Sequence, residues 1–347
     1  MPSDTVTRAI DALAGGRDLS QDEAAQVLEE IMQGDVSEVQ IAGFLIALRT
    51  KGETEDELAG LAATMRAHAT PVVVGRDDLV DTAGTGGGRP TFNVSTTAGL
   101  IAAGAGCAVA KHGNRSATSM SGSADLLEAL GARIDLGPDA VARCIAEVGF
   151  GFMFAPAHHG ATRWVVPVRK ELAVRTIFNF LGPLTNPAGA RRQLIGVSDP
   201  SYMDRMAGAL ARLGVDRALI VSGDDGLDEI SACADTHVVE VEGERIERYT
   251  VSPEDFDLPR CHFDDVRGGT PQDNAAITRA VLDGEPGPRR NLALLNAGAA
   301  IYAAGRASSL AEGVVAAGQA VDSAAATQAL DAYVELSLVA ETPAATS

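Results

Sequence analysis

The chain has 347 residues, of which 46% are hydrophobic and 22% are charged, an ordinary composition for a globular protein of one or two domains. A chain of this length buries roughly three quarters of its unfolded surface on folding, so its stability requires neither disulfides nor a structural metal. The formal net charge of −19, from 28 basic and 47 acidic residues, disfavours nucleic acid and anionic membranes as partners, because both attract proteins through counter-charge.

The N-terminal part, to about residue 70, predicts a helical domain with clear helix starts. The capping-box pattern S/T-x-x-E/Q begins at Ser20, Ser37 and Thr54, and each occurrence places the start of a short helix directly after it. A first helix is expected at about residues 5–14. Four apolar side chains fall on one face of the third predicted helix: Ile41, Phe44, Leu45 and Leu48. This face must pack against another part of the protein.

From residue 72 onward, short apolar runs bounded by glycine alternate with helical stretches, a pattern typical of βα units. The expected strands are residues 79–82, 108–110, 151–155, 193–197, 218–222 and 238–241. The expected helices are residues 96–104, 124–130, 138–148, 202–213, 274–282 and 292–304, followed by two more between 310 and about 338. The predicted fold class is α/β, with a small all-helical N-terminal domain and a larger α/β domain built on a mainly parallel central sheet.

A glycine-rich segment, residues 81–88 with the sequence Asp-Thr-Ala-Gly-Thr-Gly-Gly-Gly, follows a predicted strand and leads toward a helix. Glycines let backbone N–H groups approach an oxyanion closely, and a helix start supplies further donors, so the segment can cradle a diphosphate. A tight turn without a ligand is the alternative that the segment alone leaves open. A P-loop is excluded because no G-K-[ST] follows, and a dinucleotide-binding loop lacks its acidic partner downstream.

Two polar segments follow the glycine-rich one. Residues 91–97, Thr-Phe-Asn-Val-Ser-Thr-Thr, place an amide and hydroxyls at the expected helix entry, where they either bind phosphate or simply cap the helix. Residues 111–119, Lys-His-Gly-Asn-Arg-Ser-Ala-Thr-Ser, bring two cations, a histidine and several hydroxyls together. In so acidic a chain this segment differs from an ordinary surface loop, because a lysine supplies a point charge to phosphate oxygens while hydroxyl and backbone donors fix their orientation.

With these segments the sequence resembles the anthranilate phosphoribosyltransferases over nearly its whole length. The resemblance depends on several motifs that occur in the family's order: residues 84–87, 91–96, 111–115, 121–125, 175–187 and 228–229. It implies a Mg²⁺-dependent enzyme of tryptophan biosynthesis that catalyses the second step from chorismate. In that reaction the phosphoribosyl group of 5-phosphoribosyl 1-diphosphate is transferred to the amine of anthranilate, giving N-(5-phosphoribosyl)anthranilate and diphosphate.

The resemblance also implies the residues that bind each substrate. Those expected to bind 5-phosphoribosyl 1-diphosphate are Gly84, Gly87, Gly88, Thr91, Asn93, Val94, Ser95, Thr96, Lys111, His112, Gly113, Asn114, Arg115, Ser116, Ala117, Thr118, Ser119 and Ser123. Those expected to bind anthranilate are Gly84, Asn114 and Arg169. A guanidinium can fork onto an aromatic carboxylate, whereas a helix-surface charge is the alternative role of Arg169.

The metal ligands implied by the resemblance are Ser95, Asp228 and Glu229. Adjacent carboxylates after a predicted strand suit the oxygen coordination of Mg²⁺, although a solvated acidic turn is the alternative interpretation of this run alone. No residue is assigned as a general base, because the anilinic amine of anthranilate is already neutral near pH 7. His112 is the obvious candidate, and a loop-ordering hydrogen bond is its alternative role.

The family further implies how the chain is organised. Residues 1–70, with about 161–186, would form a helical domain that offers the anthranilate side and the dimer contacts of a homodimer. Residues 71–160 and 187–347 would form the α/β domain that binds the phosphoribosyl donor. Closure of the two parts over the substrates would exclude water and limit hydrolysis of the donor.

The sequence departs from the family pattern in two places. Where the family has an aspartate after Gly-Thr-Gly-Gly, this chain has Gly88 followed by Arg89, so we expect metal use at this end of the substrate to differ, with Arg89 taking over part of the charge compensation. His158-His159-Gly160 stands where the family has a proline after the histidine pair. A metal site at this pair is less favoured than an entrance for the aromatic acceptor.

The sequence is less consistent with two other functions than with the transferase. A pyrimidine nucleoside phosphorylase, similar in fold, would use phosphate as its nucleophile and would carry a different glycine-rich motif, and residues 111–115 favour the transferase. A non-catalytic relative that binds nucleic acid or regulates a partner is disfavoured by the charge of −19 and by an aromatic content of 4%, which leaves little for base stacking.

The cysteines and the chain start bear on the cellular location. Cys107, Cys144, Cys233 and Cys261 form no C-x-x-C motif, so we expect reduced thiols rather than a zinc or dithiol site. Residues 1–4 carry neither a basic nor an apolar signal region, and the longest small-apolar stretch, residues 97–110, is too short to span a bilayer. We therefore expect a cytoplasmic protein with no membrane partner.

Overall fold

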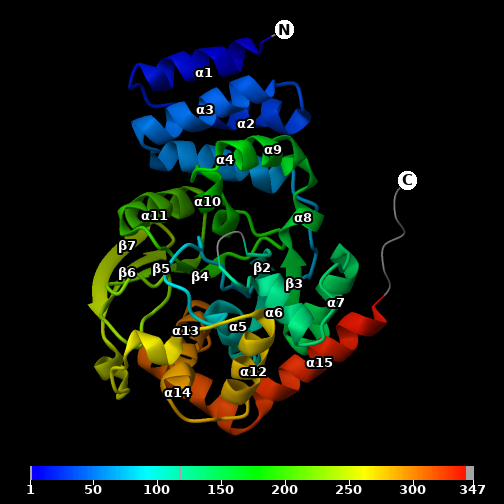
Figure 1. Ribbon diagram of the computed structural model, residues 1–347, viewed down its shortest axis with the longest axis vertical. Coiled ribbons are helices and arrows are strands. Elements are labelled where there is room, and N and C mark those ends of the chain that lie inside the picture. The colour runs from blue at the N-terminus through cyan, green and yellow to red at the C-terminus, as the bar shows by residue number, and fades with distance from the viewer. Residues whose placement is uncertain (1, 117–118, 341–347) are drawn as a thin grey trace.

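The computed structural model describes residues 2–116 and 119–340 and consists of a helical layer above a layered α/β part (Figure 1). The helical layer begins with α1 (Asp4–Ala14), α2 (Gln21–Gln33), α3 (Glu38–Lys51) and α4 (Glu55–Ala67). Each of these helices starts within a residue or so of its predicted position. The predicted helical N-terminal domain is confirmed.

The capping boxes predicted for α2 and α4 are complete. At Ser20 and at Thr54 the hydroxyl accepts the backbone N–H of the glutamate three residues on, and that glutamate accepts the backbone N–H of the capping residue. The box predicted at Ser37 is only half formed. Its hydroxyl accepts from the N–H of Gln40, but the Gln40 side chain pairs with the backbone of Ser3 instead. The prediction for this third box is therefore wrong in part, because the glutamine ties α3 to the start of α1.

The apolar stripe predicted on α3 is buried. It belongs to a cluster that joins the four helices to α11 (Met203–Arg212) and to one face of the sheet through Ile195, Ile220 and Val239. Val168 and Phe178, from the segment between the third and fourth strands, are part of the same cluster. The helical layer therefore packs directly on the sheet.

One sheet of seven strands forms the centre of the α/β part. The strands are β1 (Leu79–Asp81), β2 (Ala108–Gly113), β3 (Phe150–Phe154), β4 (Arg192–Gly196), β5 (Arg217–Gly223), β6 (Thr236–Glu242) and β7 (Arg245–Val251). Their order is β3-β2-β1-β4-β5-β6-β7. The first five strands in this order are parallel to one another, whereas β6 pairs antiparallel with β5, and β7 pairs antiparallel with β6. The predicted α/β class with a mainly parallel sheet is confirmed.

The strand β7 is absent from the sequence-based prediction. Arg245, Glu247 and Arg248 are exposed along it, so it lacks the apolar run by which the other strands were found. It pairs only with β6, at the outer edge of the sheet. Charged side chains are typical of such edge strands, because they discourage pairing with another chain.

The face of the sheet away from the helical layer is covered by a second helical set (Figure 1). Its members are α5 (Val94–Gly104), α6 (Ser123–Ala129), α7 (Pro138–Val148), α12 (Pro271–Leu282), α13 (Pro288–Ala303), α14 (Leu310–Asp322) and α15 (Ala325–Val339). The helix α5 packs against α13, α14 and α15, and its apolar residues are buried. Within the described ranges, no helix is both long and apolar enough to cross a membrane.

Between β3 and β4 the chain leaves the sheet and runs along the helical layer. It forms three short helices that were not predicted: α8 (Ala155–His158), α9 (Val166–Leu172) and α10 (Phe178–Leu181). The helix α9 contacts α3. Two connections join the parts on the way, since Thr70 donates its N–H to the carbonyl of His158 and Val72 donates to that of Pro187.

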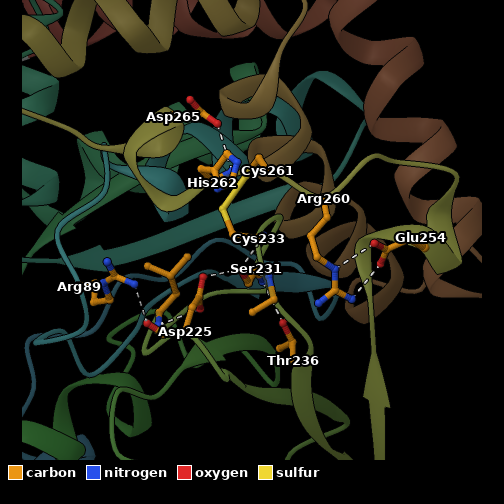
Figure 2. Close-up of a disulfide and its surroundings, with 12 residues drawn as sticks. Arg89, Asp225, Ser231, Cys233, Thr236, Glu254, Arg260, Cys261, His262 and Asp265 are labelled. Carbon is orange, nitrogen blue, oxygen red and sulfur yellow. Dashed lines mark hydrogen bonds and ion pairs between the residues drawn. A yellow bond between two sulfur atoms is a disulfide. The ribbon is translucent and has the colours of Figure 1, made fainter.

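Two of the four cysteines are not free thiols as expected. Cys233 and Cys261 form a disulfide, with Cα atoms 4.6 Å apart, while Cys107 and Cys144 are free and buried (Figure 2). The prediction failed because the bridged residues are 28 positions apart and share no motif. The fold brings the segment after β7 back to the segment between β5 and β6, where Cys261 donates its N–H to the carbonyl of Ala232 at 3.0 Å.

Candidate active site

The predicted site segments meet at the carboxyl edge of the parallel strands. The glycine-rich segment follows β1, residues 111–113 form the end of β2, and the acidic pair follows β5. Because β2, β1, β4 and β5 are neighbours in this order, their carboxyl ends share one edge of the sheet. Gly84 bridges to Gly196, the last residue of β4, and Thr85 donates its N–H to the Gly196 carbonyl at 2.8 Å.

Two glycines of the loop stand where side chains do not fit. Gly87 has a φ of 83°, and a Cβ placed on it would lie 1.6 Å from Nη2 of Arg175. A Cβ on Gly88 would lie 2.3 Å from Oδ1 of Asp228. The loop is therefore packed between an arginine and an aspartate, and its glycines are required by this close approach.

The start of α5 carries its polar side chains in distinct roles. The Asn93 side chain does not cap the helix; it donates to the Ser121 carbonyl at 3.0 Å and accepts from the Ser121 hydroxyl and the Asn274 amide. Val94 and Thr96 are buried. Asn93 thus provides no side-chain cap for α5. Within the first turn the N–H of Ser95 donates to Glu229 and that of Val94 to the Phe92 carbonyl, so an anion would bind through the N–H groups that remain.

Lys111 lies beneath this helix start and is 1% exposed. Its Nζ donates to the Thr82 carbonyl at 3.1 Å, the Thr82 hydroxyl at 3.2 Å and the Ser95 hydroxyl at 3.4 Å. Burial lowers the pKa of Lys111, and the charges of Asp81 and Glu229 oppose that shift. The lysine is therefore a buried cation between two acids at the base of the site.

Asp81, to which the sequence analysis assigned no role in the site, is fully buried at the end of β1. It accepts the backbone N–H of His112 at 3.1 Å and the Asn186 side-chain amide at 2.7 Å. Burial raises the pKa of Asp81 to about 6, against the opposing charge of Lys111. An acidic residue that closes an apolar strand next to a glycine-rich loop was the signal that could have marked it.

The acidic pair Asp228 and Glu229 lies close to the same lysine. Burial raises the pKa of Asp228, while hydrogen bonds from backbone groups and the charge of Arg175 act against it. Burial and then the charge of Asp228 raise the pKa of Glu229, while Lys111 and the N–H of Ser95 lower it. Two adjacent buried carboxyls, both with pKa values raised by burial, fit a divalent cation, which would neutralise both.

The acidic pair does not form a complete metal cage by itself. In residues 2–116 and 119–340, no group of three or more histidine, cysteine or acidic side chains is arranged to hold a metal ion. Mg²⁺ commonly binds through one or two carboxylates and completes its shell with water and phosphate oxygens. The hydroxyl of Ser95, beside Lys111, is the further protein oxygen that fits.

The loop after β2 is only partly turned toward these groups. Arg115 forms ion pairs with Asp125 at 2.8 Å and with Glu128 at 2.5 Å, so its guanidinium faces α6. Gly113 lies against Ser123, the first residue of α6. Asn114 is exposed, and its side-chain oxygen accepts the N–H of Arg115 at 2.7 Å.

The remaining residues of this loop are placed in part. Ser116 and Ser119 are joined through their hydroxyls at 2.7 Å, and the Ser116 N–H donates to Asp125. Ala117 and Thr118, two of the predicted donor-binding residues, lie outside the described residues. Thr91, by contrast, is held at the other side of the site by a bridge to Arg267.

His112 lies among buried histidines rather than in solvent. Its Nδ1 is 3.2 Å from the carbonyl of Gly182, and its ring centroid is 5.0 Å from that of His159. Burial lowers the pKa of His112 to about 3, and the charge of His159 acts in the same direction. The ring is neutral and a weak proton acceptor, which favours an ordering role over that of a general base.

The sequence predicts that Arg169 binds anthranilate and that Arg89 compensates charge near the metal and the diphosphate. Arg169 is half-buried on α9, with its guanidinium 5.5 Å from the ring centroid of Phe178, and burial lowers its pKa. The Arg89 guanidinium lies 3.5 Å from the ring centroid of Phe263 and donates to the Asp225 carbonyl (Figure 2). Arg89 thus contacts the loop that carries the acidic pair.

Comparison with known proteins defines the class first. Residues 7–69 match the helical bundle domain and residues 76–327 match the α/β domain of a glycosyl transferase family. The two parts of the fold thus correspond to the two domains of one family of group-transferring enzymes. The site, a glycine-rich loop with a buried lysine and an acidic pair, lies in the second.

Individual relatives narrow this class. The chain is 51% identical over 326 residues to the anthranilate phosphoribosyltransferase of Moorella thermoacetica, covering 94% of this chain and 96% of the relative. It is 53% identical to that of Rubrobacter xylanophilus, covering 95% and 96%. The crystal structure of the Thermus thermophilus enzyme has a TM-score of 0.91 at 46% identity, covering 95% of this chain and 99% of the other. The chain belongs to the anthranilate phosphoribosyltransferase family.

Proposed function

We infer that the chain catalyses the reaction of its family, the transfer of the phosphoribosyl group from 5-phosphoribosyl 1-diphosphate to the amine of anthranilate. The products are N-(5-phosphoribosyl)anthranilate and diphosphate, and the step belongs to L-tryptophan biosynthesis. The observation that carries this proposal is the meeting of the glycine-rich loop, the uncapped start of α5, Lys111 and the acidic pair at one edge of the sheet. Each of these four features binds or balances the charge of a diphosphate.

Mg²⁺ is the cofactor we propose, held by Ser95, Asp228 and Glu229. The anthranilate phosphoribosyltransferase of Saccharomyces cerevisiae, solved in complex with PRPP and Mg, has a TM-score of 0.88 at 27% identity, covering 97% of this chain and 99% of the other. When bound, the ion neutralises charge on the diphosphate. Because Gly88 replaces the family's aspartate, the carboxylates of residues 228 and 229 are the protein anions proposed to hold it.

The chain's own donors stabilise the leaving group. The bond from C1 of the ribose to the diphosphate oxygen breaks, the bond from C1 to the anthranilate nitrogen forms, and the amine loses a proton. In the glycine-rich loop and the first turn of α5, the N–H groups of Thr85, Gly86, Val94 and Ser95 already donate to protein acceptors. The remaining N–H groups of these two segments, with the Lys111 cation, would face the charge that develops on the diphosphate, and such fixed donors are commonly the largest catalytic term. Positioning of the neutral amine supplies much of the rest.

We place anthranilate on the side of the helical layer, bound by Gly84, Asn114 and Arg169. In this arrangement residues 1–70 with about 161–186 act as one domain and residues 71–160 and 187–347 as the other. We further propose a cytoplasmic homodimer that associates through the helical domain. The exposed apolar side chains of Val39 and Ile46 on α3 support such a contact.

The reaction is tested by the fluorescence of anthranilate. We expect it to fall when 5-phosphoribosyl 1-diphosphate and Mg²⁺ are both added, and to stay constant when either is omitted. Phosphorolysis of thymidine by the protein, with unchanged anthranilate fluorescence, would assign it to the nucleoside phosphorylases instead.

A further inference from the structure

Arg175 lies against the glycine-rich loop although it comes from a distant part of the chain. It follows α9, in the segment that runs along the helical layer, and its guanidinium occupies the space where a side chain at Gly87 would stand. Its Nη1 donates to the hydroxyl of Ser198 at 3.3 Å, and that hydroxyl donates to the Gly86 carbonyl at 2.9 Å. The arginine is thus fixed over the loop by a neutral partner.

Arg175 forms no ion pair with any carboxylate in the part of the chain that the structure describes. Among the described residues, its guanidinium forms no ion pair within 4.0 Å, whereas Arg115 and Arg212 each pair with two acidic side chains. Arg175 is exposed, and its charge still acts on Asp228. In a chain of net charge −19, an arginine left unpaired beside both the glycine-rich loop and the acidic pair is available to an anionic ligand.

We propose that Arg175 is a further binding residue for the diphosphate of the phosphoribosyl donor. The inference rests on the proposed function of this site. A guanidinium presents planar N–H donors that match two phosphate oxygens, whereas the buried Lys111 supplies a single point charge. The leaving diphosphate would then lie between a cation from the sheet and a cation from the segment of the helical layer.

The arrangement also predicts a selective effect on the two substrates. Arg175 contacts the loop and not the Phe178 region where Arg169 lies. Loss of its guanidinium should therefore weaken binding of the donor and of free diphosphate, and leave the KM for anthranilate unchanged. The loop should keep its fold, because the Ser198 hydroxyl and the Thr85 N–H still hold it.

The test compares Arg175→Ala and Arg175→Lys with a matched control, Arg205→Ala, whose guanidinium lies over the Tyr202 ring and also lacks an ion pair in the described structure. Binding of inorganic diphosphate with Mg²⁺ is measured by calorimetry, and KM values for both substrates by anthranilate fluorescence. We expect Arg175→Ala to raise the Kd for diphosphate and the KM for the donor at least tenfold, Arg175→Lys to restore part of the loss, and Arg205→Ala to match the wild type.

Each outcome decides the proposal. An unchanged Kd for diphosphate in Arg175→Ala, with an unchanged unfolding midpoint, would overturn it, and so would an equal rise in KM for both substrates. Loss of diphosphate binding in Arg175→Ala supports it even if the wild type fails to consume anthranilate. In that last case the proposed reaction is contradicted, but the proposal that Arg175 binds diphosphate is supported.

Discussion

The helical layer and the site edge of the sheet each bury a lysine, and they satisfy it in different ways. Lys51, with a side chain 5% exposed, forms ion pairs with Glu57 at 3.0 Å and Asp18 at 2.6 Å. Lys111 is as deeply buried, but its Nζ hydrogen-bonds only to neutral oxygens, and the charges of Asp81 and Glu229 act on it without forming ion pairs with it. A buried cation that forms ion pairs with protein carboxylates contributes to the stability of the fold. A buried cation without such an ion pair indicates a site where an anionic ligand can bind.

Replacing each lysine by methionine separates these roles most strongly. We expect Lys111→Met to lower kcat/KM by about 100-fold, because a buried donor to the diphosphate is lost. Lys51→Met should leave kcat/KM within a factor of two or so of wild type but cost about 3 kcal/mol of stability, because Glu57 is left buried without its cation. Kinetics and urea unfolding of both variants check this, and equal activity losses would remove the distinction.

The acidic pair, Asp228 and Glu229, differs from Lys51 in its expected effect on stability. Replacing these two carboxylates by neutral side chains should stabilise the protein, whereas replacing Lys51 should destabilise it. Burial raises the pKa of both carboxyls, so the folded protein without metal binds protons more tightly than the unfolded chain, and its stability falls as the pH rises above about 4. At pH 8 without Mg²⁺, Asp228→Asn with Glu229→Gln should therefore unfold at a higher temperature than wild type.

The same double variant tests the metal assignment. Its Mg²⁺ requirement in the fluorescence assay should shift upward by roughly tenfold or more, since an ionised carboxylate is worth more to the ion than a neutral amide. A thermal-shift series with Mg²⁺ should stabilise the wild type and not the variant. An unchanged Mg²⁺ titration would take residues 228 and 229 out of the metal site.

Much of this contrast was visible in the sequence. Capping residues such as Ser20 and Thr54 located the helices of the helical layer because a cap is a local interaction. The glycine-rich loop and Lys111 stood out as polar segments after predicted strands, and the acidic pair was assigned through the resemblance to the family. Arg175 and Asp81 were missed because their importance comes from contacts across the fold, to Gly87 and to Asn186, which no local pattern encodes.

Arg169 tests the side of the site that belongs to the helical layer. Replacing it by alanine should raise the KM for anthranilate about tenfold, the worth of one hydrogen bond to a charged group, and leave the KM for the donor unchanged. The expected effect of Arg169→Ala is therefore opposite to that of Arg175→Ala, which should raise the KM for the donor and leave the KM for anthranilate unchanged. Equal effects on both substrates would move Arg169 out of the acceptor site.

The disulfide is a support of the site edge that has no counterpart among the described residues of the helical layer. It links the loop after the acidic pair to the segment that contains Cys261 and His262 (Figure 2). This segment leads to Phe263, on which Arg89 packs. Bridging residues 28 positions apart stabilises by about 3–4 kcal/mol in the chain-entropy model. Reductant should lower the unfolding midpoint of the wild type and not that of Cys233→Ser, and Cys144→Ser should keep the wild-type response.

The helix caps are the finest test, because they should affect stability alone. Thr54→Ala removes a complete capping box and should cost about 1 kcal/mol. Ser37→Ala should cost less, since only one hydrogen bond, of 3.4 Å, is lost and Gln40 keeps its contacts with Ser3. Both variants should retain wild-type KM values for both substrates. A change in either KM would show that the positions of α3 and α4 affect substrate binding, in addition to the segment that carries Arg169 and Arg175.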